Sequence, residues 1–327
     1  MKAKKEYLIL AAIIIAAGVY LTFYKADRTQ YKLPELSKIK IDTIDRIEIT
    51  ARGKTIELGK KGIDWFIAPQ NFPADGAKIK GMLFEIEEMA VTDLVSESKA
   101  YERYQLDDKN KITVKAWSKE NLLRDFDIGK EASTYQHTFI RLPGNPNVYH
   151  VRGDFRRKFD RQDAAELRDR EVLAFDPDTL KSIRVTDGPD TLELTRKDPP
   201  PKDSEKTEKE GAASAGPTKP VWITKDGRQA DGGTLDSFLS SINNLMCENY
   251  LKGRQKDEFK NPIFEISLEG KQTYVLSVFK KADKKDDVLP AISSYNNYPF
   301  TLSSDRLNRF KKSVEKLIGK KKDSKDN

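Results

Sequence analysis

Residues 47–58 read Ile-Glu-Ile-Thr-Ala-Arg-Gly-Lys-Thr-Ile-Glu-Leu, so that apolar and polar side chains alternate on both sides of a turn that contains glycine. Alternation with a period of two is typical of a strand with one buried face, and two such runs joined by a short turn predict a β-hairpin. The same pattern returns at an offset of 136, at Ile183, Val185, Leu192 and Leu194. We therefore expect a second hairpin of the same kind.

A tryptophan-containing strand and an amphipathic helix follow the hairpin in both places. Trp65 corresponds to Trp222, and Asp75 and Asp231 stand where each helix needs a side chain to cap its free amides. Six apolar positions of the two helices coincide at an offset of 156: Ile79, Met82, Leu83, Ile86, Met89 and Ala90 in the first, and Leu235, Phe238, Leu239, Ile242, Leu245 and Met246 in the second. Their spacing gives each helix one apolar stripe that faces a core.

The similarity continues to the end of each copy. Ile112 and Val114 match Phe264 and Ile266 at an offset of 152, and the closing segment, with Tyr149, Val151, Asp154 and Phe159, matches Phe300, Leu302, Asp305 and Phe310 at an offset of 151. Runs of strands interrupted by single helices favour antiparallel α+β units over a doubly wound sheet. We predict an α+β fold of two tandem repeated units, residues 41–175 and 176–319, in which antiparallel strands pack with amphipathic helices.

The second copy contains one large insertion. Leu58 and Trp65 are seven positions apart, whereas Leu194 and Trp222 are 28 apart, so the spacing is longer by 21 in the second copy. The inserted stretch 196–219 contains three consecutive prolines, a charged run and a Gly/Ala/Ser run, and it has almost nothing to bury. This composition predicts a disordered surface loop.

The N-terminal segment is apolar on every side. Residues 7–24 form a run of 18 uncharged residues with tyrosines at both ends. As a helix the run covers about 27 Å, just short of the roughly 30 Å of a bilayer core, which favours a transmembrane helix between a tail at 1–6 and a linker at 25–40. The alternative is a cleaved signal peptide ending near Ala16-Ala17-Gly18.

The flanking charges do not decide the orientation, because lysines and arginines stand on both sides of the apolar run. The short tail and the large following domain resemble a signal anchor. We therefore expect a single-pass protein of the bacterial cytoplasmic membrane, with most of the chain outside the cytoplasm.

The charge is concentrated at the termini. The net charge is +7, with 59 basic and 52 acidic side chains, but residues 1–32 carry six basic against two acidic side chains and residues 309–327 carry eight against three. The body between them is therefore slightly negative, which argues against a nucleic-acid partner, and we interpret residues 320–327 as a solvated basic tail. One cysteine and two histidines exclude disulfide scaffolds and the common zinc sites.

Five residues are candidate contacts for a ligand or between the two units. Trp65 and Trp222 are either stacking platforms for a sugar or peptide or members of the core. Arg168, Asp169 and Arg170 are either an ion-paired bridge between the copies or a ligand site. Asp75 and Asp231 are interpreted as helix caps rather than a catalytic carboxylate pair.

Two further groups are weaker candidates. A hairpin that turns at Gly144-Asn145 pairs residue 137 with 152 and 139 with 150, which places His137 and His150 on one face, either as a conceivable anion site or as a solvated surface. Cys247 has no basic neighbour in the sequence that would lower its pKa, so it is a weak nucleophile candidate.

A set of short motifs carries a resemblance to a known family. They are Trp65, Pro73-Ala74-Asp75, Tyr104-Gln105-Leu106-Asp107, Ile128-Gly129, Val148-Tyr149, Leu167-Arg168-Asp169-Arg170 and Phe175-Asp176-Pro177. With these motifs, most of residues 40–310 resembles the bacterial family called domain of unknown function 4340. Gln105 stands where that family tends to have glycine, which leaves the conformation of that turn open.

The resemblance implies a membrane-anchored protein whose gene often neighbours those of gliding-motility-type ABC transporters. It supplies no catalytic residues, and the sequence contains no nucleophile elbow, Walker loop or dinucleotide fingerprint. We therefore expect a non-enzymatic binding or auxiliary subunit of an ABC-type transporter or of envelope assembly, with a protein partner such as a transporter permease and no cofactor or metal. The alternative is an extracytoplasmic enzyme that acts on envelope carbohydrate or peptide through carboxylates.

Overall fold

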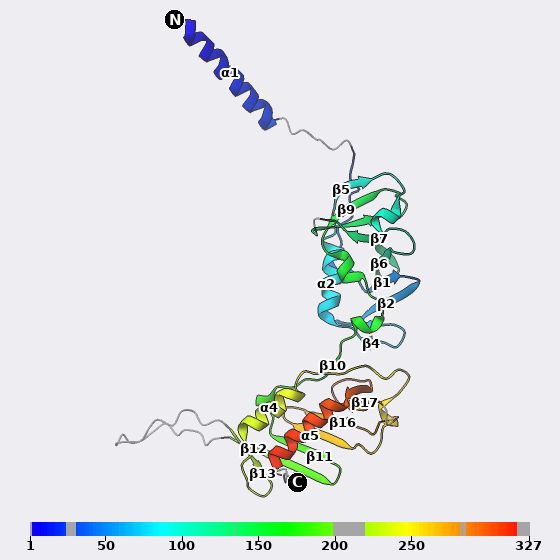
Figure 1. The fold of residues 1–327 in the computed structure, drawn as a ribbon, viewed down its shortest axis with the longest axis vertical. Coiled ribbons are helices and arrows are strands. Elements are labelled where there is room, and N and C mark those ends of the chain that lie inside the picture. Colours follow the sequence, from blue (N-terminus) through cyan, green and yellow to red (C-terminus); the bar gives the residue numbers. More distant parts are fainter. Residues whose placement is uncertain are drawn as a thin grey trace, which may run out of the picture. The chain divides into compact units, whose positions relative to one another are not determined.

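The structure, a computed structural model of the 327-residue chain, describes residues 2–23, 31–133, 135–198, 220–281, 283 and 286–318. The stretch 47–58 forms a hairpin of strands β1 (Arg46–Ala51) and β2 (Lys54–Lys61), in which Ile47 pairs with Leu58. Two large antiparallel sheets dominate the architecture (Figure 1). The contacts divide the chain into two units: unit 1 is Met1–Gly59 with Ala77–Gln162, and unit 2 is Lys60–Gly76 with Asp163–Asn327.

Unit 1 contains a meander whose strands lie in the order β2-β1-β6-β7-β8-β9-β5. The further strands are β5 (Val91–Ser96), β6 (Ile112–Ser118), β7 (Asn121–Glu131), β8 (His137–Arg141) and β9 (Val148–Arg152). Its helices are α2 (Gly76–Glu87) and the short α3 (Phe155–Phe159). Phe155 and Phe159 of α3 both make edge contacts with the ring of Phe126 on β7, so α3 packs against the buried face of the sheet.

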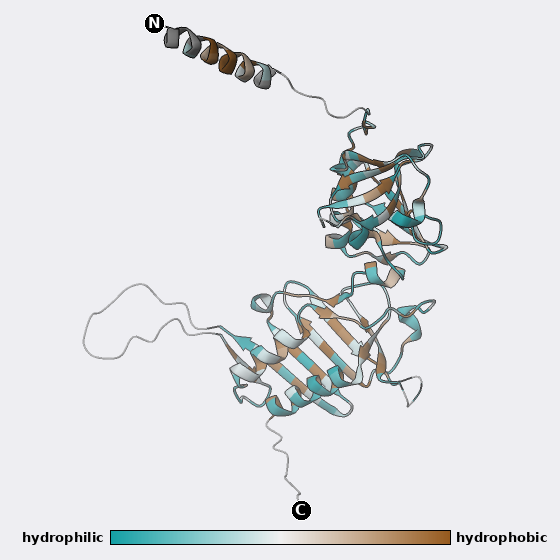
Figure 2. Cartoon of the chain, turned by 45° about the horizontal axis from the view of Figure 1, so that its top comes forward, coloured by the Kyte–Doolittle hydropathy of each residue, from teal (hydrophilic) through white to brown (hydrophobic). Residues whose placement is uncertain are grey.

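Unit 2 contains a seven-stranded sheet in the order β13-β12-β11-β15-β16-β17-β18. Its strands are β11 (Ser182–Asp187), β12 (Asp190–Lys197), β13 (Val221–Thr224), β15 (Phe264–Glu269), β16 (Thr273–Val278), β17 (Val288–Ser293) and β18 (Phe300–Ser303). Helices α4 (Gly232–Ile242) and α5 (Ser304–Ile318) lie over the sheet, and Figure 2 shows apolar bands along its strands. The shorter strands of this unit are β3 (Asp64–Ile67), β4 (Phe72–Pro73), β10 (Glu171–Leu173) and β14 (Leu245–Met246).

The two meanders share one strand register. Ile47 pairs with Leu58 in unit 1 and Ile183 with Leu194 in unit 2, both at the offset of 136. On the other side of the same strands, Val114 pairs with Ile49 and Ile266 with Val185, at the offsets of 152 and 136. The apolar stripes of α2 and α4 are buried at equivalent positions, with Leu83 5% and Leu239 4% exposed.

The predicted α+β class is wrong, because the described chain is mostly β. Two large antiparallel sheets account for most of its regular structure. The helices are few, and those that pack on the two sheets are short: α5 has 15 residues, α2 has 12, α4 has 11 and α3 has five. The period-two alternation that predicted the hairpins continues through the long meanders, so each unit buries its core mainly on a sheet face.

The predicted transmembrane anchor at residues 7–24 is also not supported. The N-terminal helix α1 spans Lys2–Phe23. Of the helices that the described residues build, none combines the length and apolar content needed to cross a bilayer.

Other predicted boundaries fall partly outside the described residues. Strand β12 continues to Lys197, so the predicted insertion at 196–219 does not begin at residue 196, and its residues 199–219 lie outside the described part of the chain. The basic tail 320–327 lies outside it as well. Of the linker at 25–40, residues 31–40 are described, and they contain no helix or strand.

Candidate functional site

The Arg168-Asp169-Arg170 segment lies in unit 2, between a short 3₁₀ turn at Ala164–Leu167 and strand β10. Its backbone joins two distant parts of the sequence. Arg168 forms a bridge with Ala74, the Asp169 amide donates to the Pro73 carbonyl at 2.9 Å, and the Arg170 carbonyl accepts from the Cys247 amide at 2.8 Å. The segment therefore connects the β3–β4 hairpin with β14 inside one unit.

The Arg168 side chain is 7% exposed and lies over an aromatic cluster. Its guanidinium carbon is 4.6 Å from the centroid of the Phe72 ring, and its Nε has no hydrogen-bond partner among the residues that the structure describes. Phe72 stacks on Tyr250 at 5.2 Å and makes an edge contact with Tyr298 at 5.0 Å. A cation over a desolvated ring is stabilised by about 2 kcal/mol, so this contact supports the core of unit 2.

Asp169 and Arg170 are used within the protein. The Arg170 Nε and Nη2 donate to the Cys247 carbonyl at 2.8 and 2.5 Å, and Nη2 lies 3.5 Å from the Glu248 carboxylate. The Asp169 carboxylate accepts from the Glu171 amide at 2.9 Å. Arg170–Glu248 is the one ion pair of the segment among the described contacts, so backbone hydrogen bonds, more than the expected ion pairs, hold it in place.

The two tryptophans take equivalent positions in unit 2. Trp65 on β3 is 7% exposed, and Trp222 on β13 is half-buried against the unit 2 core. The Trp65 carbonyl accepts from the Ala74 amide and the Trp222 carbonyl from the Ala230 amide, both at 2.8 Å. This repeated backbone contact and the burial fit a packing role for both side chains.

The carboxylates before the helices and the single cysteine do not form a reactive group. Asp231 caps α4 by accepting from the Thr234 amide at 2.8 Å, and Asp75 directly precedes α2, with its own amide donating to the Leu167 carbonyl. Cys247 is buried, and burial raises the pKa of its thiol to about 11, against a lowering effect of Arg170. The thiol is therefore protonated near neutral pH, which opposes a nucleophilic role.

The two histidines lie together on the β8–β9 hairpin, in the register that the turn predicted. His137 pairs with Arg152 and Phe139 with His150, and the two imidazole centroids are 5.5 Å apart. Burial lowers the pKa of His150, and the neighbouring His137 adds to this effect. Within the described residues no group of three or more potential metal ligands occurs.

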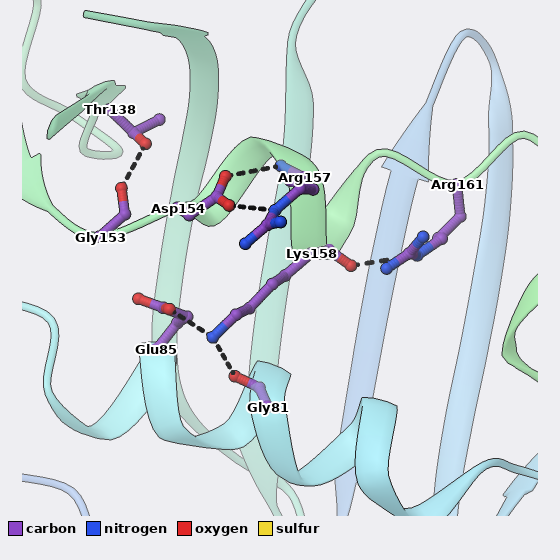
Figure 3. A network of polar contacts seen from close by, with 8 residues as sticks. All are labelled: Gly81, Glu85, Thr138, Gly153, Asp154, Arg157, Lys158 and Arg161. Carbon is purple, nitrogen blue, oxygen red and sulfur yellow. Dashed lines mark hydrogen bonds and ion pairs between the residues drawn. The ribbon is translucent and has the colours of Figure 1, made fainter. Parts of the chain in front are cut away.

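An ion pair between a partly exposed lysine and a buried carboxylate joins α2 to α3 in unit 1 (Figure 3). The Lys158 Nζ donates to the Glu85 carboxylate at 2.6 Å, and the Thr138 hydroxyl donates to the Gly153 carbonyl at 2.8 Å. The Asp154 side chain caps α3 by accepting from the Arg157 amide. Since Glu85 is 8% exposed, the pair supplies the charge that this buried carboxylate requires, and we interpret the network as structural.

A surface depression in unit 1, which we call the cationic basin, was not predicted from the sequence. It has a volume of about 700 Å³. Its floor is the polar face of β6, β7 and β8, with Thr113, Lys115, Asp125, Asp127 and Arg141, and its rim contains Lys99, Tyr101, Lys111 and residues 142–146. The alternation of polar side chains at 111, 113 and 115 and at 125 and 127 is the sequence signal that could have located it.

Asp127 and Arg141 form a fixed pair at the centre of the cationic basin. The Asp127 Oδ1 accepts from the Thr113 hydroxyl at 2.6 Å, and Oδ2 accepts from the Arg141 Nε and Nη2 at 3.1 and 2.5 Å. The Arg141 guanidinium also lies 4.5 Å from the Tyr101 ring centroid, and the Tyr101 hydroxyl donates to the Pro146 carbonyl. The guanidinium is therefore held from two sides.

The other charged groups of the cationic basin make fewer hydrogen bonds and ion pairs than Asp127 and Arg141. Lys115 lies opposite Asp125 in the strand register, and burial raises the pKa of Asp125, with Lys115 opposing and Asp127 reinforcing the shift. Lys111 pairs with the exposed Asp108 at 2.8 Å, and its Nζ lies 3.7 Å from the Asp127 Oδ2. Lys99 and Lys115 donate no side-chain hydrogen bond among the described contacts. The arrangement can hold an anion, and its central carboxylate has no free oxygen for chemistry.

Comparison with known proteins gives one result. The model of a family described as a domain of unknown function (DUF4340) matches residues 65–262. No curated protein and no solved structure matches the chain.

Proposed function

The chain belongs to the DUF4340 family, and on that premise we propose that it is a non-enzymatic binding or auxiliary subunit that acts by holding a protein partner. The proposal rests on the charged side chains of the cationic basin and on the contacts that they already make. It is a surface depression with convergent charged groups, as a binding site requires, but its central carboxylate, Asp127, is already ion-paired with Arg141 and hydrogen-bonded by Thr113.

The enzymatic alternative needs a pair of carboxylates, one of which donates a proton while the other attacks or activates water. Asp125 and Asp127 lie on one face of β7, and the raised pKa of Asp125 would suit a proton donor. Asp127, however, accepts hydrogen bonds on both oxygens. The pair therefore lacks a free base or nucleophile, which favours binding over hydrolysis.

We propose that the partner is a subunit of an ABC-type transporter, on the gene neighbourhood that the family resemblance implies. The test is co-purification of the tagged full chain with the permease encoded beside it, followed by size-exclusion chromatography. Co-elution in a fixed ratio is the expected result. Failure of every neighbouring transporter subunit to co-elute overturns the partner assignment.

The binding role has its own counter-experiment. If the purified chain hydrolyses envelope carbohydrate or peptide, and the Asp125→Asn variant abolishes the hydrolysis without unfolding, the protein is an enzyme. A matched Asp108→Asn variant removes an exposed carboxylate at the edge of the same surface and controls for loss of charge.

An extracytoplasmic location is a separate proposal. It is compatible with the single cysteine of the chain, because a protein with one cysteine has no internal disulfide to form. A reporter fused after Asn327 that is active only outside the cytoplasm should give signal. Signal from a reporter that is active only in the cytoplasm would refute this location.

A further inference from the structure

We propose that the cationic basin binds an extended, acidic peptide segment of the protein partner. This assignment rests on the proposed binding role and adds to it the site and the chemistry of the recognised segment. Three features of the described residues carry it: the surplus of positive charge, the distance over which the cations are spread, and the comparison with unit 2.

The charge of the cationic basin favours an anionic ligand. Four cationic side chains line it against two carboxylates, Asp125 and Asp127. Asp127 is held mainly by Arg141 and Thr113, so it compensates the lysines only weakly. Lys99 and Lys115 remain without a hydrogen-bonded acceptor among the described contacts, and the closest partner of Lys111, Asp108, has a side chain that is 93% exposed. A surplus of cations in a partly enclosed site attracts and orients acidic groups.

The spread of the cations favours an extended chain over a compact anion. Lys111 and Lys115 lie on the same face and are four positions apart, which corresponds to about 13 Å along a strand. One phosphate or carboxylate group cannot meet both ammonium groups unless the two lysine side chains lean fully toward each other across this backbone spacing. An extended segment with several acidic side chains can, and Tyr101, Pro143 and Pro146 supply apolar rim contacts for its backbone and side-chain stems.

Unit 2 shows that the sheet does not need these charges. In the shared register the Lys115–Asp125 pair of unit 1 corresponds to Ser267–Val275, and the Asp127–Arg141 pair corresponds to Ser277–Ile292. The meander therefore forms with neutral side chains at the positions of Lys115 and Arg141. Since the equivalent sheet forms without a cation at either of these two positions, we assign Lys115 and Arg141 to recognition.

The test measures binding of labelled peptides to the full chain by fluorescence anisotropy. The probes are a peptide of six glutamates, a neutral peptide of six glutamines, and succinate and inorganic phosphate as unlabelled competitors. The variants are Lys99→Gln and Lys115→Gln, and the matched control is Lys271→Gln, which removes an exposed lysine from unit 2. Circular dichroism verifies that each variant is folded.

The glutamate peptide should bind, the glutamine peptide should not, and binding should weaken as salt is raised. Lys99→Gln and Lys115→Gln should each weaken it about two- to five-fold, because partly exposed charge pairs contribute up to about 1 kcal/mol. An equal loss in Lys271→Gln, or no preference for the glutamate peptide, overturns the assignment. Competition by succinate or phosphate at the peptide's own concentration also overturns it, in favour of a small anion.

The same variants separate this inference from the proposed function. If the permease co-elutes with the Lys99→Gln and Lys115→Gln variants as it does with the unaltered chain, the basin is not the contact, while the binding role stands. If no partner co-elutes with the unaltered chain, the proposed function itself fails.

Discussion

Gly153 shows how a single residue supports the ion pair between Glu85 and Lys158 in unit 1. Its φ is 125°, in a region that side-chain-bearing residues rarely adopt. A Cβ at this position would lie 2.3 Å from the Glu85 Oε2 and 3.1 Å from the Phe155 ring. The absence of a side chain is therefore what allows Glu85 to reach its place beside Lys158.

We expect Gly153→Ala to lower the free energy of unfolding by more than about 2 kcal/mol, because backbone strain and overpacking act together. Chemical denaturation of the full chain, followed by tryptophan fluorescence and circular dichroism, measures the change. Gly59→Ala is the control, since a Cβ there meets no atom of the described chain within 4 Å. A Gly153→Ala variant as stable as Gly59→Ala would refute the steric argument.

Cys247 makes the stability of unit 2 depend on pH. Burial raises the pKa of its thiol to about 11, above the roughly 8.5 of an unfolded cysteine. The folded state therefore keeps the proton to higher pH than the unfolded state does. This contribution to stability is fully present below about pH 8.5, falls as the pH rises, and is lost by about pH 11.

The expected result is a lower free energy of unfolding at pH 9.5 than at pH 8, measured by chemical denaturation of the full chain. Cys247→Ala should show a smaller pH-dependent loss, because it removes the titrating thiol. The interval stays below the range of Tyr295, whose pKa is raised to about 12 chiefly by burial. Equal slopes in both proteins would show that the thiol does not titrate differently on folding.

At the scale of single residues, the sequence predicted contacts between neighbours along the chain better than contacts between residues that are far apart in sequence. The turn at Gly144-Asn145 correctly predicted that His137 pairs with Arg152. Gln105 adopts a φ of 55°, a left-handed conformation that glycine adopts without steric cost, and this settles the turn that the sequence left open. The aromatic cluster under Arg168 was not predictable in this way, because Phe72, Tyr250 and Tyr298 are far apart in sequence and meet only in the fold.

At the scale of elements, helices α2 and α4 allow the equivalence of the two copies to be tested. Leu83 and Leu239 are buried at equivalent positions of the two apolar stripes. Truncation of either to alanine should cost about 2–5 kcal/mol, from lost transfer energy and the cavity left behind. Chemical denaturation of each variant measures the cost.

The controls are Lys80→Ala and Asp236→Ala, which remove exposed side chains at matching positions on the same helices. Each should change the free energy of unfolding by no more than about 0.5 kcal/mol. A large loss for Leu83→Ala with none for Leu239→Ala would mean that the two helices do not play equivalent parts in their cores.

The elements also show why the fold class was misjudged. Local periodicity placed the hairpins and the helices at 76–87 and 232–242 close to where they lie. Local periodicity could not give the proportion of helix to strand in the whole chain. The fold class depends on that proportion, and therefore on how much of the remaining chain is strand. The polar face of β6 to β8 illustrates the same limit: its alternation was visible, but only the strand order brings Lys115, Asp127 and Arg141 onto one surface.

At the scale of the whole molecule, the division into units does not follow the order of the sequence. Residues 60–76 precede α2 of unit 1 along the chain but belong to unit 2. Phe72 is 2% exposed and lies in the same core cluster as Leu239, Tyr250 and Phe300. The unit 2 core therefore depends on a segment that the repeat pattern assigns to the first copy.

This dependence predicts which unit is destabilised by a mutation at residue 72. Phe72→Ala removes a buried ring from the unit 2 core and from its contacts with Arg168 and Tyr250, and it should cost about 3–5 kcal/mol. Hydrogen exchange read by mass spectrometry should show lost protection in peptides from β14, β17 and β18, as Leu239→Ala does. Peptides from β6 to β8 should keep their protection, although Leu83→Ala weakens it. If Phe72→Ala instead reproduces the exchange pattern of Leu83→Ala, residues 60–76 belong energetically to unit 1, and the division of the chain follows the sequence repeat after all.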